Sequence, residues 1–312
     1  MKKIVVTGSL AFDHIMNMPG KFSDHILADK LYILNVSFLV DTLKKQRGGT
    51  AGNVAYSLAL LGIKPVLIAT LGKDGKRYKN KLKSFGVDTD GVKIVNGDRS
   101  ASGFVITDKK DNQVWIFYQG AMSSASKLSL NLTGDELVLV GPNDPKAMVK
   151  YVDECVKAKS MYMYDPAFAI SYLSKSQLKK GIENAAVIIG NDYEKSKLMK
   201  LTKMSEKKLL ERGKVMITTL GAKGSLIRKG NKTIKIKAAR VKNTSDPTGA
   251  GDAYRAGFLA GFVNGLPLDV CGRMGAVAAA YTVEKYGTQT HKFTISEFRK
   301  RYKDNFGKGT IL

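Results

Sequence analysis

The sequence predicts an α/β protein built on one large, mostly parallel β-sheet. Short apolar runs rich in β-branched residues alternate with segments of helical periodicity, which is typical of a parallel sheet with crossover helices. The length of 312 residues suits either about two domains or one large α/β domain with an insertion. We expect a single domain over residues 1–312, with helices flanking the central sheet in three layers.

The alternation starts at the beginning of the chain. The run Ile4–Thr7 predicts the first strand, and residues 53–61 predict a helix because Val54, Leu58 and Leu61 recur at helical spacing. A strand at 66–69 and a Lys-rich helix around 78–85 follow. The same pattern resumes later in the chain. We expect further strands at Leu137–Val140, Met161–Tyr164, 187–189 and 215–218, and helices at 147–156, 253–263 and 270–283.

Two stretches interrupt this alternation, at about 14–46 and about 94–120. They contain β-type patterns at 32–36, 104–107 and 114–118, and the turn-rich residues 108–112 predict a hairpin between the last two. We expect them to form a small β-sheet outside the main one. Such an inserted sheet is well placed to act as a lid.

Composition excludes several classes of protein. Hydrophobic residues make up 44% of the chain and charged residues 25%, as in ordinary globular domains. No apolar run approaches the roughly 18 residues of a membrane span, so we expect no membrane partner. Cys155 and Cys271 lack metal-ligand spacing. We interpret them as buried reduced thiols, which favours a cytoplasmic protein.

The formal net charge of +24 suggests an acidic partner. However, 41 of the 51 basic residues are Lys, whereas specific phosphate and base contacts usually use Arg. The charge therefore indicates a solvated Lys-rich surface. We expect nonspecific attraction to polyanions at low salt and no specific nucleic-acid site.

The strongest local signal is the segment 246–252, Asp-Pro-Thr-Gly-Ala-Gly-Asp, which precedes a helix of small apolar residues. Glycines at a helix N-terminus let backbone N–H groups face an anion, and the helix dipole adds partial positive charge. Asp252 is suited there to take a proton from an attacking hydroxyl. The structural alternative is that Asp252 only caps the helix.

Other polar positions carry weaker signals. No Gly-Lys pair is followed by Ser or Thr, which excludes a Walker A loop. Thr219, Gly221 and Gly224 could contact a nucleotide or form a simple glycine turn. Asp165 could serve a phosphate or metal region, or be a turn residue before Pro. Asp13 could bind two neighbouring sugar hydroxyls, or sit in a turn.

A second glycine segment lies near the start of the chain. Gly48, Gly49 and Asn53 precede or open a predicted helix, where they could admit a small polar ligand or form a loop with an N-cap. The spacing of these residues with Ala55, Gly62 and Gly72 resembles the amino-terminal signature of the PfkB carbohydrate and nucleoside kinases. Residues 246–252 resemble the carboxy-terminal signature of that family. The resemblance covers essentially the whole chain.

The resemblance implies a ribokinase-like fold and a kinase that moves the γ-phosphoryl group of ATP to a primary hydroxyl under a β-lid. Asp252 then resembles the base, and Gly249, Ala250 and Gly251 the anion hole. Asn191 and Glu194 match an Asn-x-x-Glu motif that would hold Mg²⁺ through water. The remaining roles that it implies are nucleotide contacts at Thr219, Gly221, Gly224 and Thr248, an acceptor site at Asp13, Gly48, Gly49 and Asn53, and a possible K⁺ site at Asp246, Thr248 and Gly287.

The acceptor is predicted from the lid. Phe104 and Phe117 belong to an aromatic-rich lid that suits stacking on a nucleobase. Together with a similarity to microbial adenosine kinases, this favours a nucleoside, with adenosine first and purine salvage as its context. A sugar such as ribose or fructose is the alternative, and a non-catalytic nucleotide- or polyanion-binding protein is a second one. The resemblance allows either a monomer or a homodimer paired through the lid.

Overall fold

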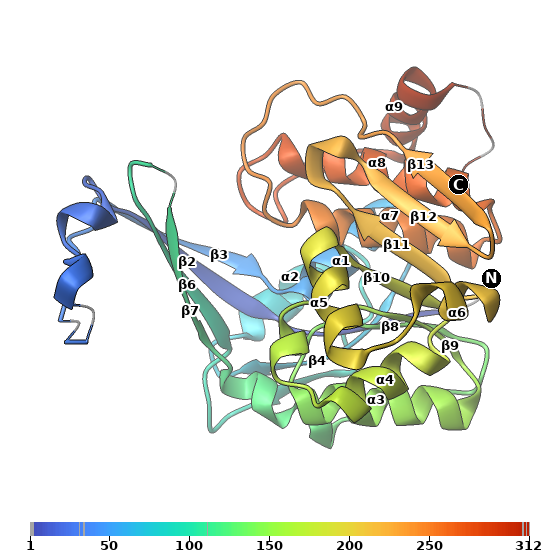
Figure 1. The fold of residues 1–312 in the computed structure, drawn as a ribbon, viewed down its shortest axis with the longest axis horizontal. Coiled ribbons are helices and arrows are strands. Elements are labelled where there is room, and N and C mark those ends of the chain that lie inside the picture. Colours follow the sequence, from blue (N-terminus) through green and yellow to red (C-terminus); the bar gives the residue numbers. More distant parts are fainter. Residues whose placement is uncertain are drawn as a thin grey trace.

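The computed structural model describes residues 3–30, 32, 33, 35–110, 112–307, 309 and 311. Its main sheet has the strand order β13-β12-β11-β10-β9-β8-β1-β4-β5 (Figure 1). The pairs from β5 through β11 are parallel, and β12 and β13 add an antiparallel edge. The strands are β1 Ile4–Thr7, β4 Val66–Gly72, β5 Val92–Val95, β8 Leu137–Val140, β9 Met161–Tyr164, β10 Val187–Asn191, β11 Val215–Thr219, β12 Ser225–Lys229 and β13 Lys232–Ile236.

Alternate residues of these strands face opposite layers, as the pleat requires. Ile4 and Val6 pack into one core, whereas Val5 between them packs into the other. The first core contains the helices α1 Thr50–Leu60, α2 Lys76–Ser84, α7 Ala250–Val263, α8 Leu268–Val283 and α9 Ile295–Phe306. The second contains α3 Pro145–Ala158, α4 Lys175–Asn184, α5 Asp192–Thr202 and α6 Glu206–Glu211. The expected three-layer α/β fold is confirmed (Figure 1).

A separate four-stranded sheet, which we call the lid, projects from the main body (Figure 1). Its strand order is β3-β2-β6-β7. The strands are β2 Ala11–Asn17, β3 Thr42–Gly48, β6 Ala101–Thr107 and β7 Gln113–Tyr118. The predicted hairpin is present, because β6 and β7 pair antiparallel around a loop whose turn is fixed by Asp108 accepting from the Lys110 and Asn112 amides.

The boundaries of the lid differ from the expected ones in two places. Residues 94 and 95 end β5, which belongs to the main sheet, so the second lid segment begins at Ala101. Residues 32, 33, 35 and 36 form no strand, and residue 34 lies outside the described part of the chain. Exposed Tyr32 and Ile33 find no neighbouring strand, and a β-type pattern alone cannot supply one.

Short 3₁₀ helices complete the described elements. They are η1 Phe22–Asp24, η2 Ala28–Lys30, η3 Gly120–Lys127, η4 Ala167–Ser171 and η5 Gly221–Lys223. Cys155 and Cys271 are both free and buried, in agreement with the sequence. Within the described ranges, no helix has the length and apolarity that crossing a bilayer demands.

The topology brings the chemistry-bearing segments to one edge of the sheet. Asp165, Asn191 and Thr219 follow or end the adjacent strands β9, β10 and β11 at their carboxyl ends. The β1 strand leads directly into the lid strand β2, and α7 packs against α1. Ligands of open α/β sheets bind at such carboxyl edges.

Candidate active site

The first turn of α7 forms the floor of the site. Gly249 is the N-cap of this helix and adopts a left-handed conformation, with φ of 80°. A Cβ there would also lie 3.0 Å from Thr288, so both backbone and packing require glycine. The Ala250 amide donates to the Pro247 carbonyl at 3.1 Å. Ala250 is one of the predicted anion-hole residues, and its amide would have to give up the bond to Pro247 in order to bind an anion.

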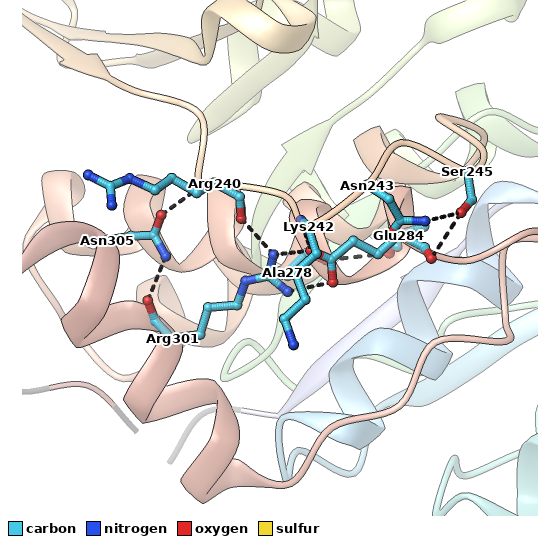
Figure 2. A network of polar contacts seen from close by, with 9 residues as sticks. Arg240, Lys242, Asn243, Ser245, Ala278, Glu284, Arg301 and Asn305 are labelled. Atoms are coloured by element: carbon cyan, nitrogen blue, oxygen red, sulfur yellow. Dashed lines mark hydrogen bonds and ion pairs between the residues drawn. The ribbon is translucent and has the colours of Figure 1, made fainter.

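The loop that leads into α7 is fixed from outside the site (Figure 2). Glu284 accepts both from the Arg301 guanidinium and from the Lys242 amide. Arg301 also donates to the Arg240 carbonyl at 2.6 Å. The amides of Ser245 and Asp246 both bond to the Val283 carbonyl. This network ties residues 240–246 to α8 and α9, so the position of the 246–252 segment is set before any ligand binds.

Asp252 lies in the first turn of α7, and its residue is only partly exposed. Its Oδ2 accepts a hydrogen bond from Asn53 Nδ2 at 2.8 Å, which joins α7 to α1 across 199 residues. Burial raises the pKa of Asp252 to about 6, although Arg255 and the Asn53 bond act in the opposite direction. A carboxylate with a pKa near 6 is ionised at neutral pH yet basic enough to receive a proton.

Arg255 follows Asp252 by three residues and is itself buried. Its Nε lies 2.5 Å from Asp165 Oδ2, and its Nη2 donates to Asp165 Oδ1 at 2.9 Å. This buried ion pair, with one hydrogen bond, joins α7 to the end of β9. Burial by itself would lower the pKa of Arg255, but the neighbouring Asp165 and Asp252 together raise it above its usual value, and so the guanidinium stays charged. Asp165 is thus neither a free turn residue nor an open metal ligand.

The lid contributes Asp13 to the same site. Asp13 in β2 pairs with Gln46 in β3 and Gly103 in β6, and its carboxylate fills the space that a Cβ on Gly48 would need. Burial, and then the nearby Asp246, raise the pKa of Asp13 to about 6. Asp13, Gly48, Asn53 and Asp252 are thus brought together. Gly49 has φ of 87° and lies against the backbone of Ser9, so the close approach of the chain requires glycine, and its place in the acceptor site stays a prediction.

Asn191 and Glu194 form a capping box at the start of α5. Glu194 donates its amide to Asn191 Oδ1 at 2.7 Å, and Asn191 donates its amide to Glu194 Oε2 at 2.8 Å. The motif thus also stabilises the start of the helix, as capping boxes do. Burial also raises the pKa of Glu194, with Asp165 as a further cause. Glu194 therefore lies close to the Asp165–Arg255 pair.

The predicted nucleotide residues lie on the neighbouring strand. Thr219 pairs in register with Asn191, so the ends of β11 and β10 are adjacent. Gly221 adopts φ of 58° with open space around it, whereas a Cβ at Gly224 would collide with the Ile236 carbonyl. Gly224 is therefore required by the approach of the chain to β13. Gly221 is the more accessible of the two glycines.

The predicted monovalent-cation residues are joined by Asp246. Asp246 Oδ1 accepts from the Thr248 amide at 2.9 Å, and its Oδ2 accepts from the Gly287 amide at 3.0 Å. Each oxygen keeps a second lone pair. Among the residues that the structure describes, no group of three or more His, Cys, Asp or Glu side chains could by itself hold a metal ion.

Phe104 and Phe117, the two lid phenylalanines predicted to contact the acceptor, face opposite sides of the lid. Phe117 pairs with Gly103, next to Asp13, whereas Phe104 pairs with His14 and stacks on its ring at 4.7 Å. Adjacent strand residues alternate in direction, so Phe117 shares the face of Asp13 and Phe104 does not. The sequence could not show this because the register was unknown.

Phe117 also marks a groove that sequence reasoning missed. Its ring lies 5.7 Å from that of Phe168 on the main body. The groove has a volume of about 520 Å³, and its lining includes Phe117, Phe168, Tyr172, Asn191, Tyr193 and Glu194. Phe168 lies in the short 3₁₀ helix η4 and Tyr172 directly follows it, and no periodic pattern could single out either residue.

Three comparisons place the chain among known proteins. Residues 1–294 match the model of the pfkB family carbohydrate kinases. A nucleoside kinase of Methanocaldococcus jannaschii is 31% identical over 293 residues, which cover 93% of each chain. Its crystal structure aligns with 98% of this chain and 99% of its own, with a TM-score of 0.87.

A second solved relative is the nucleoside kinase of Burkholderia thailandensis. Its complex with inosine is 31% identical and has a TM-score of 0.88, covering 98% of this chain and 99% of that one. Its complex with ADP-inosine is 33% identical, with a TM-score of 0.86, covering 99% of this chain and 98% of that one. Fold and site together define a phosphotransferase. The chain belongs to the pfkB family of carbohydrate kinases, and it is a kinase that transfers a phosphoryl group from ATP to an alcohol.

Proposed function

We propose that this kinase phosphorylates the 5′-hydroxyl of a nucleoside, with Asp252 as the general base. The observation that carries the proposal is the convergence of Asp252, Asn53 and Asp13 where the lid meets the start of α7. The M. jannaschii and B. thailandensis relatives, both nucleoside kinases, support the substrate class. Among nucleosides we place adenosine first and purine salvage as its context.

The reaction that follows from this arrangement is a direct displacement. Asp252 takes the proton of the acceptor hydroxyl while the hydroxyl oxygen forms a bond to the γ-phosphorus. At the same time the bond between the γ-phosphorus and the oxygen that bridges it to the β-phosphate breaks. ADP leaves with the electron pair. Backbone N–H groups of the first turn of α7, with the dipole of a 14-residue helix, are suited to hold the developing negative charge.

We propose that Asn191 and Glu194 hold Mg²⁺ through water. Their amide and carboxylate oxygens are the donors that this ion prefers, and their mutual capping bonds fix them at the edge of the groove. When bound, Mg²⁺ neutralises phosphate charge. Asp246, with Thr248 and Gly287, would similarly offer oxygens to K⁺.

The acceptor assignment draws on the Phe117–Phe168 pair. The two rings lie on opposite sides of the lid–body junction and are 44% and 41% exposed. Aromatic faces of this kind stack on a planar base, whereas a sugar ring is not planar and offers them less contact. We therefore place the base at this pair, and the ribose hydroxyls at Asp13, which can accept from two neighbouring donors.

We further propose a cytoplasmic enzyme that pairs through the lid. Two buried free thiols suit a reducing compartment. The edge strand β7 carries five apolar residues that are 39% to 60% exposed, from Val114 to Tyr118. An exposed apolar edge strand favours pairing with a second copy. Light scattering of the intact protein and of an Ile116→Lys variant distinguishes a dimer from a monomer.

The test of the function is ATP-to-ADP turnover with Mg²⁺ and K⁺ over a panel of nucleosides and sugars, run beside Asp252→Asn. We expect a nucleoside to stimulate turnover and the variant to lose at least about 100-fold, because general base catalysis supplies 10²–10⁴. Stimulation by ribose or fructose alone would refute the acceptor. No stimulation by any acceptor would point to a binding protein.

A further inference from the structure

We propose that Gln289 and Tyr78 are positioning residues, which hold the Asn53 amide in the orientation that lets it donate to Asp252. This inference rests on the proposed function, because it connects the two residues to the base of that reaction. Neither residue belongs to the two signature segments. Tyr78 lies in α2 and Gln289 lies in the loop between α8 and α9.

A continuous chain of hydrogen bonds joins these residues. Gln289 Nε2 donates to Asn53 Oδ1 at 2.9 Å and to Tyr78 Oη at 2.5 Å. Tyr78 Oη in turn donates to the Gly48 carbonyl at 2.8 Å. At the other end, Asn53 Nδ2 donates to Asp252 Oδ2 at 2.8 Å. The chain therefore runs from the acceptor-site glycine to the base.

The chemistry of the groups fixes the direction of every bond. The single hydroxyl proton of Tyr78 goes to the Gly48 carbonyl, so the Tyr78 oxygen accepts from its other neighbour. Only the nitrogen end of the Gln289 amide can satisfy that oxygen and also donate to Asn53. Asn53 must then present its oxygen to Gln289 and its nitrogen to Asp252. A reversed Asn53 amide would place two acceptors against each other at Asp252 and two donors against each other at Gln289.

Because these side chains are buried, the donor and acceptor directions of their hydrogen bonds are fixed. Tyr78 is 1% exposed, Asn53 5% and Gln289 8%, so none of them can exchange a lost partner freely with water. An unpaired polar group at such depth is costly, because water cannot replace the lost hydrogen bond. The network is thus a rigid support for the Asn53 amide and fixes its orientation in the folded protein.

The orientation matters because of the charges around Asp252. Arg255 on its own helix favours the ionised carboxylate, whereas Asp165 after β9 and Asp13 on β2 oppose it. The bond from Asn53 also favours ionisation. If the amide turned, its oxygen would face the carboxylate and the pKa of Asp252 would rise above about 6. The base would then be protonated at pH values where the intact enzyme works.

The test compares Gln289→Met, which keeps side-chain length but lacks donors, with Tyr78→Phe. Tyr151→Phe is the matched control, because Tyr151 is equally buried and its hydroxyl donates to the Ala125 carbonyl at 2.7 Å, far from the site in α3. Two quantities are measured between pH 5 and 9. They are kcat with the best acceptor of the panel, nucleoside or sugar, and the ¹³C shift of the Asp252 carboxyl carbon.

We expect Gln289→Met to raise the Asp252 midpoint and the acidic limb of kcat by about one pH unit. Such a shift lowers the ionised fraction about fivefold at pH 6 and hardly at pH 8. Tyr78→Phe should shift both in the same direction by less, and Tyr151→Phe should shift neither. A pH-independent loss in Gln289→Met, or an equal shift in the control, would overturn the proposal.

The same measurements separate this inference from the proposed function. If only a sugar is phosphorylated, the nucleoside assignment fails, while the kcat profile with that sugar still tests the network. If no acceptor is phosphorylated, the carboxyl titration alone decides whether Gln289 controls Asp252. A midpoint unchanged by Gln289→Met then refutes the positioning role.

Discussion

At the scale of single residues, the site contains a carboxylate, Asp252, whose ionisation lowers the stability of the folded protein. The pKa of Asp252 rises from 3.8 to about 6 because burial outweighs the favourable contacts with Arg255 and Asn53. Between these two values the folded protein binds more protons than the unfolded one. Asp252 therefore destabilises the fold increasingly as the pH rises from about 4 to about 6, and fully above that range.

Asp252→Asn should consequently be more stable than the intact protein while being almost inactive. A shift of about two pKa units corresponds to roughly 3 kcal/mol, so we expect a gain of about 1–3 kcal/mol in the free energy of unfolding at pH 8. The gain should shrink to well under about 1 kcal/mol near pH 4, where the folded carboxyl is protonated and the unfolded one is roughly half protonated. Urea denaturation at both pH values measures it. An equal gain at both would contradict a charge-based cause.

At the scale of elements, the start of α5 allows the helix-capping role of Glu194 to be tested separately from its proposed role in Mg²⁺ binding. Glu194→Gln retains an oxygen that can accept from the Asn191 amide, so the capping box persists and the stability should change by less than about 0.5 kcal/mol. The carboxylate charge is lost, however. We expect the Mg²⁺ concentration for half-maximal turnover to rise by about 10- to 100-fold, as when a metal loses a water-mediated partner.

The matched control for α5 is Glu297→Gln. Glu297 forms the same capping box with Thr294 at the start of α9, where it accepts from the Thr294 amide at 2.7 Å. Its loss of charge should leave the Mg²⁺ dependence unchanged. If Glu194→Gln and Glu297→Gln behave alike in magnesium titrations, the Asn191–Glu194 pair is only a helix cap.

The lid offers its own reporter. Trp115 is the single tryptophan of the chain and is 53% exposed on β7. Its ring lies over Gly103, on the face that carries Asp13. If the lid closes on the acceptor, Trp115 becomes buried, and its emission should move to shorter wavelength. Titration with a nucleoside measures this, and Trp115→Phe removes the signal. An unchanged spectrum at saturating acceptor would exclude closure over Trp115.

At the scale of the whole molecule, the net charge of +24 acts through the surface. A polyanion held by six to ten neutralised phosphates loses about 10³- to 10⁵-fold in affinity between 50 and 200 mM salt. We expect binding of single-stranded DNA to collapse in this way, while turnover of ATP changes only a few-fold because the site is small and partly enclosed. DNA binding that persists at 200 mM salt would indicate a specific nucleic-acid site.

Much of the fold can be predicted from the sequence because the helices and strands depend on local periodicity. The strands Ile4–Thr7, Leu137–Val140 and Met161–Tyr164 occur at the predicted residues, since short apolar runs suit a sheet covered on both faces. The antiparallel edge β12–β13 and the polar helix α9 were not predicted. Their patterns are short or weakly apolar, so tertiary packing decides them.

The site divides in the same way. The sequence by itself determined the family signatures, the base Asp252 as a prediction, and the glycines, because each depends on residue type and spacing along the chain. Only the tertiary structure decided that Phe117 rather than Phe104 shares the face of Asp13, that Asp165 pairs with Arg255, and that Gln289 and Tyr78 support Asn53. These relations depend on strand register and on contacts between residues that are 90 to 236 positions apart in the sequence, and no local pattern encodes them.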